Sequence, residues 1–398
     1  MSRVLHWRAV FSARSAASSA VIVSRNSPGF IGGSERSCAL LATVLEERGL
    51  RVSVVWPERE PGRWVYRSGL GPLWLSRRVA SDPRVAAAGL VVTNGIFGWG
   101  FPTSARRIHV FHGTLAEMTR AEAAGLTRQE RIAAGLPRQE LFRRRWGDGG
   151  AEALAARHAT VVCVSESTAE EVSRHYRVRA DAVIPNGVDL SVFAPRPRAD
   201  ARAKLGLPAG ERLALFAGRL NASKGAAFLL PSCERAGYRL MVAGPRGASG
   251  GLYLGALTPH ELALAYAAAD CVLLPSLYEA CSYVLLEALA CDVPVLTTRL
   301  GSVSSLLRSV PEYDALCVEP SEDDLAAKLH YLRHTDCRAV ISRARAHVVE
   351  NNSLERYAAR WNELLDAVQA TGGLRSPPAS HAPDCGPPAL GSERAAQT

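Results

Sequence analysis

The sequence lacks features that define several other classes of protein. It has no uninterrupted run of about 18 apolar residues, so a conventional membrane-spanning helix is not predicted. None of its nine cysteines is spaced as CxxC, which argues against a zinc ribbon and a disulfide framework. No GxGxxG follows a predicted strand, which disfavours a nicotinamide-dependent dehydrogenase. The odd number of cysteines and their apolar surroundings favour a reducing cytoplasm.

Both ends of the chain lack the composition of a folded core. Residues 1–19 contain three arginines, many serines and alanines, and no acidic residue. This composition is similar to that of a transit peptide, but we favour a disordered or misassigned start. Residues 371–398 are rich in Gly, Pro, Ser and Ala, and we predict a disordered tail there.

The length and composition indicate a soluble globular protein of two domains. The chain has 398 residues, enough for two sizeable cores, and 47% of them are hydrophobic and 21% charged. The net charge of +9 suits an anionic substrate, nucleic acid or an acidic membrane surface, and by itself it does not choose among them.

Strand and helix patterns alternate along both halves. Parallel strands with helical crossovers imply doubly wound α/β sheets. The pattern restarts at residue 212, after a proline-bearing linker, so we place a boundary near residue 193. The predicted units are a first domain over 20–192, a second over 193–352 and a closing amphipathic helix over 353–370.

Residues 271–298 form the stretch around which the second half is organised. An apolar strand, a polar corner, an apolar helix and a second strand follow one another here. Glu279 lies at the corner and Glu287 in the helix, eight residues on, which corresponds to a rise of ~12 Å in continuous helix. One carboxylate could serve each end of a nucleotide sugar. On spacing alone, a structural role is equally favoured.

Three other positions carry candidate chemistry at strand ends. Gly32 and Gly33 precede a helix start, where their backbone could approach a phosphate, although such loops are often mere turns. Arg219 and Lys224 follow a strand, where two cations can neutralise a diphosphate, although surface cations are usually just solvated. His112 ends the strand 106–113, and structural and functional roles are equally favoured.

Residues 114–150 differ from the rest of the chain. AAGLTRQE at 123–130 recurs as AAGLPRQE at 133–140, and the segment ends in LFRRRWGD. Its arginines and aromatic residues could touch an anionic membrane surface. We favour a solvated helical insertion.

Taken together, the motifs resemble those of the family 4 retaining glycosyltransferases, which have the GT-B fold. The motifs that carry the resemblance are GGSERS (32–37), FHG (111–113), VSES (164–167), PNGVD (185–189), GRLNASKG (218–225) and the E-x7-E of Glu279 and Glu287. The resemblance covers roughly residues 20–370. It implies two facing Rossmann-like domains, with the acceptor on the first, the nucleotide sugar mainly on the second and a helix crossing back.

The resemblance also implies roles for particular residues. Arg219 and Lys224 would hold the diphosphate, Glu279 the donor sugar and Glu287 the ribose, with His112 near the sugar. The implied catalytic set is Glu279, Arg219, Lys224 and His112, and the implied donor-binding set is Gly32, Gly33, Asn186, Ala280, Cys281, Ser282, Tyr283 and Glu287.

The implied activity is transfer of a hexose from a nucleoside diphosphate sugar to a glycan, lipid or small molecule. It needs no metal or other cofactor, because fixed cations can stabilise the charge that develops on the phosphate. We expect no nucleic-acid partner and a cytoplasmic protein, with peripheral contact to an anionic membrane left open. Two departures from the family pattern lie in the second domain. Ala280-Cys281-Ser282 replaces the usual residues after Glu279, which leaves the identity of the donor sugar open. Only about twenty residues separate Lys224 from Gly244, and this shortened domain permits a second interpretation. The alternative is therefore a catalytically idle nucleotide-sugar binding protein.

Overall fold

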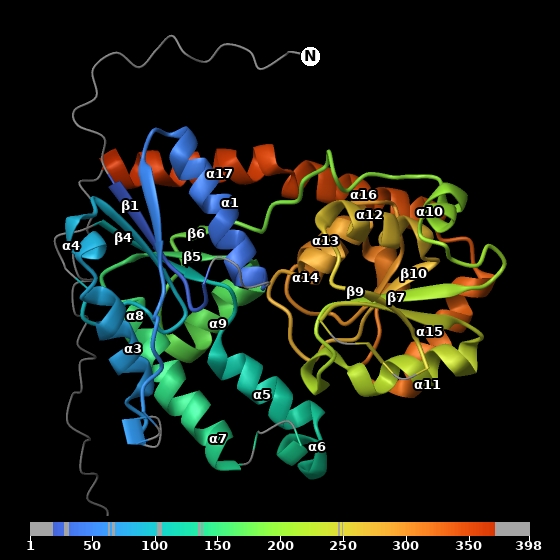
Figure 1. Cartoon of the computed structure of the whole chain (residues 1–398), viewed down its shortest axis with the longest axis horizontal. Helices are drawn as coiled ribbons and strands as arrows, with labels where there is room; N and C mark the ends of the chain where they lie inside the picture. The colour runs from blue at the N-terminus through green and yellow to red at the C-terminus, as the bar shows by residue number, and fades with distance from the viewer. Residues whose placement is uncertain are drawn as a thin grey trace, which may run out of the picture.

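A computed structural model (Figure 1) describes residues 19–27, 32–62, 64–65, 68–101, 106–133, 136, 138–245, 247–248 and 250–370. The predicted tail and nearly all of the predicted disordered start lie outside the described residues. Ser19, the last residue of that start, is the first residue of strand β1.

The first part of the chain builds a six-stranded sheet in the order β2-β1-β3-β4-β5-β6, and all its strand pairs are parallel. The strands are β1 (Ser19–Val23), β2 (Arg51–Val55), β3 (Leu90–Asn94), β4 (Arg106–Phe111), β5 (Thr160–Cys163) and β6 (Ala182–Val183). The helices are α1 (Gly33–Glu47), α3 (Gly71–Ala80), α4 (Pro83–Ala87), α5 (Leu115–Gly125), α6 (Arg128–Ala133), α7 (Arg138–Phe142), the π-helical turn Arg143–Asp148, α8 (Gly149–Ala155) and α9 (Glu166–Tyr176). We call this part the first domain.

The second part builds a five-stranded parallel sheet in the order β11-β10-β7-β8-β9. The strands are β7 (Leu213–Ala217), β8 (Arg239–Ala243), β9 (Leu252–Gly255), β10 (Cys271–Leu274) and β11 (Val295–Thr297). The helices are α10 (Arg198–Lys204), the 3-10 turn Ala222–Lys224, α11 (Ala226–Ala236), α12 (Pro259–Ala268), α13 (Tyr283–Ala290), α14 (Val303–Ser309), the 3-10 turn Pro311–Leu316, α15 (Glu322–His334) and α16 (Arg338–Asn352). We call this part the second domain.

The central strands are buried on both faces, which is why they read as continuous apolar runs. All five residues of β7 and all four of β10 are buried. Helix starts follow local capping chemistry. The Ser165 side chain caps α9, and Thr258 and Glu261 form a capping box at α12.

Helix α17 (Leu354–Ala370) returns from the second domain to the first and runs beside α1 (Figure 1). Tyr357 and Trp361 are buried in this contact, and the Arg48 guanidinium donates to the Asn362 amide oxygen at 2.9 Å. The predicted pair of doubly wound parallel sheets and the predicted crossing helix are therefore confirmed. The boundary near residue 193 stays a prediction.

The connection between β8 and β9 is unusually short. Only residues 244–251 join these two parallel strands, and the described part of that connection contains no helix. Parallel strands normally need a crossover of about a dozen residues or more. The shortened segment expected from the sequence is thus present, and it lies beside the edge strand of the second sheet.

Candidate functional site

The turn 276–282 between β10 and α13, which we call the Glu279 turn, is the place where the first domain meets the second. A Cβ on Gly33, at the start of α1, would lie 3.9 Å from the Tyr283 ring. A Cβ on Gly113 would lie 2.6 Å from the Tyr278 hydroxyl. Two glycine motifs that are far apart in sequence therefore approach the same short stretch.

A third motif of the first domain reaches the same turn. The buried Asn186 side chain donates from Nδ2 to the Cys281 carbonyl oxygen at 2.8 Å. Its own carbonyl accepts from the Asn352 side chain at 3.1 Å, which ties the turn to the end of α16. Ala280, Cys281 and Ser282 are all buried, and Ser282 precedes the first residue of α13.

Within the second domain, Lys224 is paired with Glu279. Its Nζ lies 2.6 Å from Glu279 Oε1, and the Ser276 hydroxyl donates to the same oxygen at 2.8 Å. The loop that carries Lys224 is held close, because Leu277 N donates to the Ser223 carbonyl at 2.8 Å. Arg219 lies at the end of β7 with an exposed side chain. The structure thus joins Lys224 and Glu279 directly and leaves Arg219 at the surface.

Glu287 is deeply buried in α13, with 1% of its surface exposed. It forms an ion pair with Arg36 of α1 and accepts from the Tyr266 hydroxyl at 3.0 Å. The Arg36 guanidinium also lies over the Tyr283 ring, 4.4 Å from its centroid. Burial raises the pKa of the Glu287 carboxyl, and Arg36 acts in the opposite direction.

Sequence reasoning missed Arg36, although the residue lies inside the GGSERS motif. It also missed a second link between the domains, centred on Tyr278. The Tyr278 hydroxyl donates to Glu171 Oε2 at 2.6 Å and accepts from the Thr114 amide at 2.9 Å. The Thr114 hydroxyl donates to the same carboxylate oxygen at 2.9 Å. The available signal was the position of Tyr278 next to Glu279 and of Thr114 directly after FHG.

His112 lies at the carboxyl end of β4 and lines a cavity of about 520 Å³. Ser34, Glu152 and Tyr278 line the same cavity, so it touches both the start of α1 and the Glu279 turn. Burial lowers the pKa of the His112 imidazole to about 4, so the ring is neutral at pH 7. We call this space the His112 cavity.

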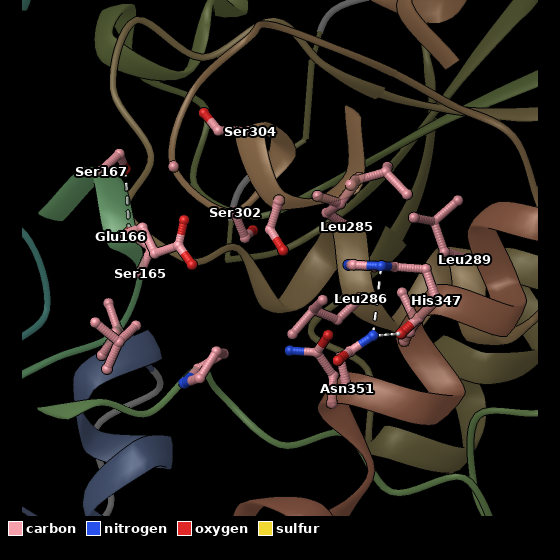
Figure 2. A pocket seen from close by; sticks show the side chains of 18 of the residues that line it. Ser165, Glu166, Ser167, Leu285, Leu286, Leu289, Ser302, Ser304, His347 and Asn351 are labelled. Carbon is pink, nitrogen blue, oxygen red and sulfur yellow. Dashed lines mark hydrogen bonds between the residues drawn. The ribbon is translucent and has the colours of Figure 1, made fainter. Parts of the chain in front are cut away.

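A second cavity, of about 210 Å³, lies between the domains on another side of α13. Figure 2 shows Ser165, Glu166 and Ser167 of the VSES motif on one side and His347 and Asn351 of α16 on the other. Asn351 donates to the His347 carbonyl at 2.9 Å. None of the predicted site residues lines this cavity, but Gly301, which does, lies so close to the turn that a Cβ on it would clash with the Glu279 and Ala280 carbonyl oxygens.

The segment 114–150 is helical, as expected, but it is not merely solvated. Leu126 and Leu136 occupy the same position in the two copies of the echo, and both are buried in one cluster with Leu277 of the Glu279 turn. Arg143 is paired with Glu140 and Asp148, and Arg144 with Glu122, so these arginines are held within the protein. The expectation of a solvated insertion is corrected, because the repeated leucines bury apolar surface against the second domain.

The described residues contain no group of three His, Cys, Asp or Glu side chains that could hold a metal ion. In the same part of the chain, no helix is long and apolar enough to cross a membrane.

Two family models match the chain. "Glycosyltransferase Family 4" matches residues 31–192, and "Glycosyl transferases group 1" matches residues 211–334. The D-inositol 3-phosphate glycosyltransferase of Saccharomonospora viridis is 30% identical over 309 residues, which make up 68% of this chain and 64% of that relative. The chain therefore spans less than two thirds of that relative's length.

Solved structures share the fold at low sequence identity. The sucrose-phosphate synthase of Thermosynechococcus elongatus superposes with a TM-score of 0.72 at 20% identity, covering 89% of this chain and 100% of that chain. Anabaena HepE in complex with UDP-glucose superposes with a TM-score of 0.61 at 16% identity, covering 88% and 99%.

Two facing parallel sheets, joined by a helix that crosses back to the first, define the GT-B class of glycosyltransferase fold. Within that class, the chain belongs to the family 4 glycosyltransferases.

Proposed function

We propose that this protein is a retaining hexosyltransferase that uses a nucleoside diphosphate sugar and no metal ion. The observation that carries the proposal is convergence on the Glu279 turn. GGSERS, FHG, PNGVD and GRLNASKG come from four separate loops, and each has a residue in contact with residues 277–283. Glycines stand at two of these contacts: Gly113 lets the Tyr278 side chain approach its backbone closely, and a Cβ at Gly33 would meet the Tyr283 ring only at 3.9 Å.

The chemistry assigned to the second domain is electrostatic. Lys224 and Arg219 neutralise the diphosphate as the bond from the sugar C1 to the phosphate oxygen breaks and the oxygen keeps the electron pair. Glu279 then binds sugar hydroxyls. In the structure Lys224 is paired with Glu279 and its side chain is 31% exposed, so the cation is held at the turn and stays open to a diphosphate oxygen. Glu287 binds the ribose in this proposal, with Arg36 beside it.

The acceptor is bound mainly by the first domain, near His112. Its hydroxyl oxygen attacks C1 from the face that the phosphate leaves, and its proton passes to the departing phosphate oxygen. The configuration at C1 is thereby retained, and no protein nucleophile is needed. The neutral His112 imidazole contributes a hydrogen bond to the donor sugar.

Similar proteins support a nucleotide-sugar donor. One structure with this fold holds UDP-glucose, and a relative is named for glycosyl transfer to D-inositol 3-phosphate. The short connection between β8 and β9 changes part of the second domain. The binding experiment described next therefore identifies the nucleotide base of the donor. A cytoplasmic location is part of the proposal. The odd number of cysteines and the lack of CxxC spacing favour a reducing compartment.

A panel of UDP-, GDP- and ADP-sugars tested by thermal shift identifies the donor, because a ligand that binds the native state raises the melting temperature. With that donor, we expect Lys224→Ala to lower turnover by about 100-fold, the usual effect of removing one group that stabilises the developing charge. Glu279→Gln removes a charged acceptor of the sugar hydroxyls and the partner of Lys224, and it should lower turnover by about 10- to 100-fold. Lys204→Ala, at an exposed lysine of α10, is the matched control.

Circular dichroism shows whether the variants remain folded. Undiminished turnover in both site variants would refute the assignment. Donor binding without hydrolysis or transfer would instead identify an idle binding protein. Nuclear magnetic resonance of the product tests retention at C1, and turnover unchanged by EDTA tests metal independence.

A further inference from the structure

The His112 cavity carries information about the acceptor, an inference that rests on the proposed function. The cavity touches Ser34 next to Gly33, Tyr278 next to Glu279, and His112 itself. It therefore adjoins the places where the proposed donor sugar is held. The other walls come from the first domain, the side on which the acceptor is expected.

One wall of this cavity is apolar. The side chains are contributed by α3, by the turn after β3 and by α5, and they are Pro72, Leu75, Ile96, Phe97 and Met118. Pro72, Leu75 and Phe97 are buried and support this wall from behind, whereas Ile96 and Met118 are partly exposed and present the apolar surface to the cavity. An apolar face of a ligand would gain about 25 cal/mol for each Å² that it buries here.

The cavity also holds three arginines, but each has a carboxylate partner. Arg25 lies 2.7 Å from Glu60. Arg143 lies 2.7 Å from Glu140 and 2.8 Å from Asp148.

The third arginine, Arg144, lies 2.7 Å from Glu122, whose side chain is 7% exposed. Three guanidinium groups thus face four carboxylates. A phosphate bound here would compete with these carboxylates for the guanidinium groups and would be repelled by four negative charges that three arginines do not outnumber.

The remaining polar groups suit hydroxyls. His112 is neutral near pH 7, because burial lowers its pKa to about 4. Glu152 is buried, and its Oε2 accepts from the Leu115 amide at 2.9 Å and from the Tyr176 hydroxyl at 2.5 Å. Both of these bonds end on Oε2, so neither of them occupies Oε1.

We propose that the His112 cavity binds the acceptor, and that the acceptor is an uncharged, hydroxyl-bearing molecule with an apolar face rather than a phosphorylated polyol. Its apolar face packs on Ile96 and Met118, the partly exposed side chains of the apolar wall. A hydroxyl beside it forms a hydrogen bond with Oε1 of the Glu152 carboxyl group, which orients the neighbouring hydroxyl that receives the sugar.

The test uses the full-length protein with the nucleotide sugar that gives the largest thermal shift. Release of nucleoside diphosphate is measured in buffer alone and with 4-nitrophenyl β-D-glucopyranoside, octyl β-D-glucopyranoside or D-myo-inositol 3-phosphate. We expect at least one neutral glycoside to raise the release tenfold or more, with a glycosylated product, and the inositol phosphate to leave it unchanged.

Stronger stimulation by the inositol phosphate overturns the inference. So does donor hydrolysis that neither glycoside stimulates. If no nucleotide sugar shifts the melting temperature or is hydrolysed, the proposed function fails first, and the acceptor inference falls with it.

A second experiment tests the charge argument by gain of function. Glu140→Gln combined with Asp148→Asn removes both partners of Arg143, and we expect the inositol phosphate then to stimulate release at least tenfold more than in the natural protein. Asp82→Asn, which removes the partner of the exposed Arg84 on α4, is the control. If the double variant does not fold, Glu140→Gln alone gives the same comparison at a side chain that is 31% exposed. No gain in a folded variant overturns the charge argument.

Discussion

At the scale of single residues, Gly113 of the first domain lies directly against Tyr278 of the second. Its φ of +123° is rarely adopted by L residues, and an added Cβ would lie 2.6 Å from the Tyr278 hydroxyl. We expect Gly113→Ala to displace Tyr278 from Thr114 and Glu171 and to lower kcat/KM by at least tenfold. Steady-state kinetics and the melting temperature measure the effect.

A control variant is needed to separate the effect of backbone strain at Gly113 from the effect of the clash with Tyr278. Gly49, after α1, also has a positive φ of +80°, but a Cβ there would meet nothing within 4 Å. Gly49→Ala should therefore cost about 1–2 kcal/mol of stability and leave kcat/KM unchanged. Equal effects of the two substitutions on kcat/KM would refute the contact argument.

Single residues also show what the sequence could predict about the site. Lys224 and Glu279 were both singled out from strand-end positions, and they lie in one ion pair. Arg36 was not, because its partner Glu287 is 251 positions away and the pair exists only once the domains pack together. Its charge gave no signal, since an arginine near a helix start is usually solvated.

At the scale of elements, the echo in 114–150 has a packing role. It places Leu126 just after α5 and Leu136 between α6 and α7, at equivalent positions of the repeat, and both belong to one small buried cluster with Leu277. We expect Leu136→Ala to cost about 2–5 kcal/mol locally, as is usual for truncating a buried leucine. The Glu279 turn would lose its support, so kcat/KM should fall while the rest of the chain stays folded.

Hydrogen exchange at residues 276–282, together with kinetics, checks this prediction. Ile132→Ala is the matched control, because Ile132 lies on α6 between the two leucines and is 58% exposed. Faster exchange and lower kcat/KM in Leu136→Ala alone support the packing role. Unchanged exchange at the turn would show that the echo does not support it.

Regular elements were the best predicted part of the fold. Buried strands such as β7 and β10 are short apolar runs, and parallel sheets require such runs. The π-helical turn Arg143–Asp148 was not predicted, since its form depends on pairing of Arg143 with residues on both sides. A helix with paired charges and a solvated helix have the same sequence pattern.

At the scale of the whole molecule, motif order predicted two facing domains, but not how they touch. The described links include Arg36 with Glu287, Tyr278 with Glu171, and Arg308 with Glu166. In each of these links, the sequence pattern around the two residues would place their side chains on the exposed surfaces of two separate domains. Their geometry is set by the approach of two independently folded sheets, which no local periodicity encodes.

The buried Glu152, in helix α8 of the first domain, makes the free energy of unfolding depend on pH. Glu152 faces Tyr176 and the Leu115 amide, which lower its pKa, and Asp148 and Glu171, which raise it. Desolvation dominates and raises the pKa from 4.5 to about 7. The folded state therefore holds a proton that the unfolded state releases between these two values, and stability falls as the pH rises through this window.

A rise in pKa of this size corresponds to about 3 kcal/mol. Glu152→Gln cannot titrate, so the natural protein should lose about 3 kcal/mol relative to this variant between pH 4.5 and pH 8. His112, whose pKa is lowered to about 4, makes stability fall as the pH drops below 6.5, but this contribution is present in both proteins and cancels in the difference.

Urea denaturation at several pH values measures that difference. Glu363→Gln, at an exposed glutamate of α17, should give a curve parallel to that of the natural protein. If the curve for Glu152→Gln is parallel as well, Glu152 does not hold its proton in the folded state. Glu152 would then line the His112 cavity as a charged carboxylate, and it would repel an anionic acceptor more strongly than a neutral carboxyl group does.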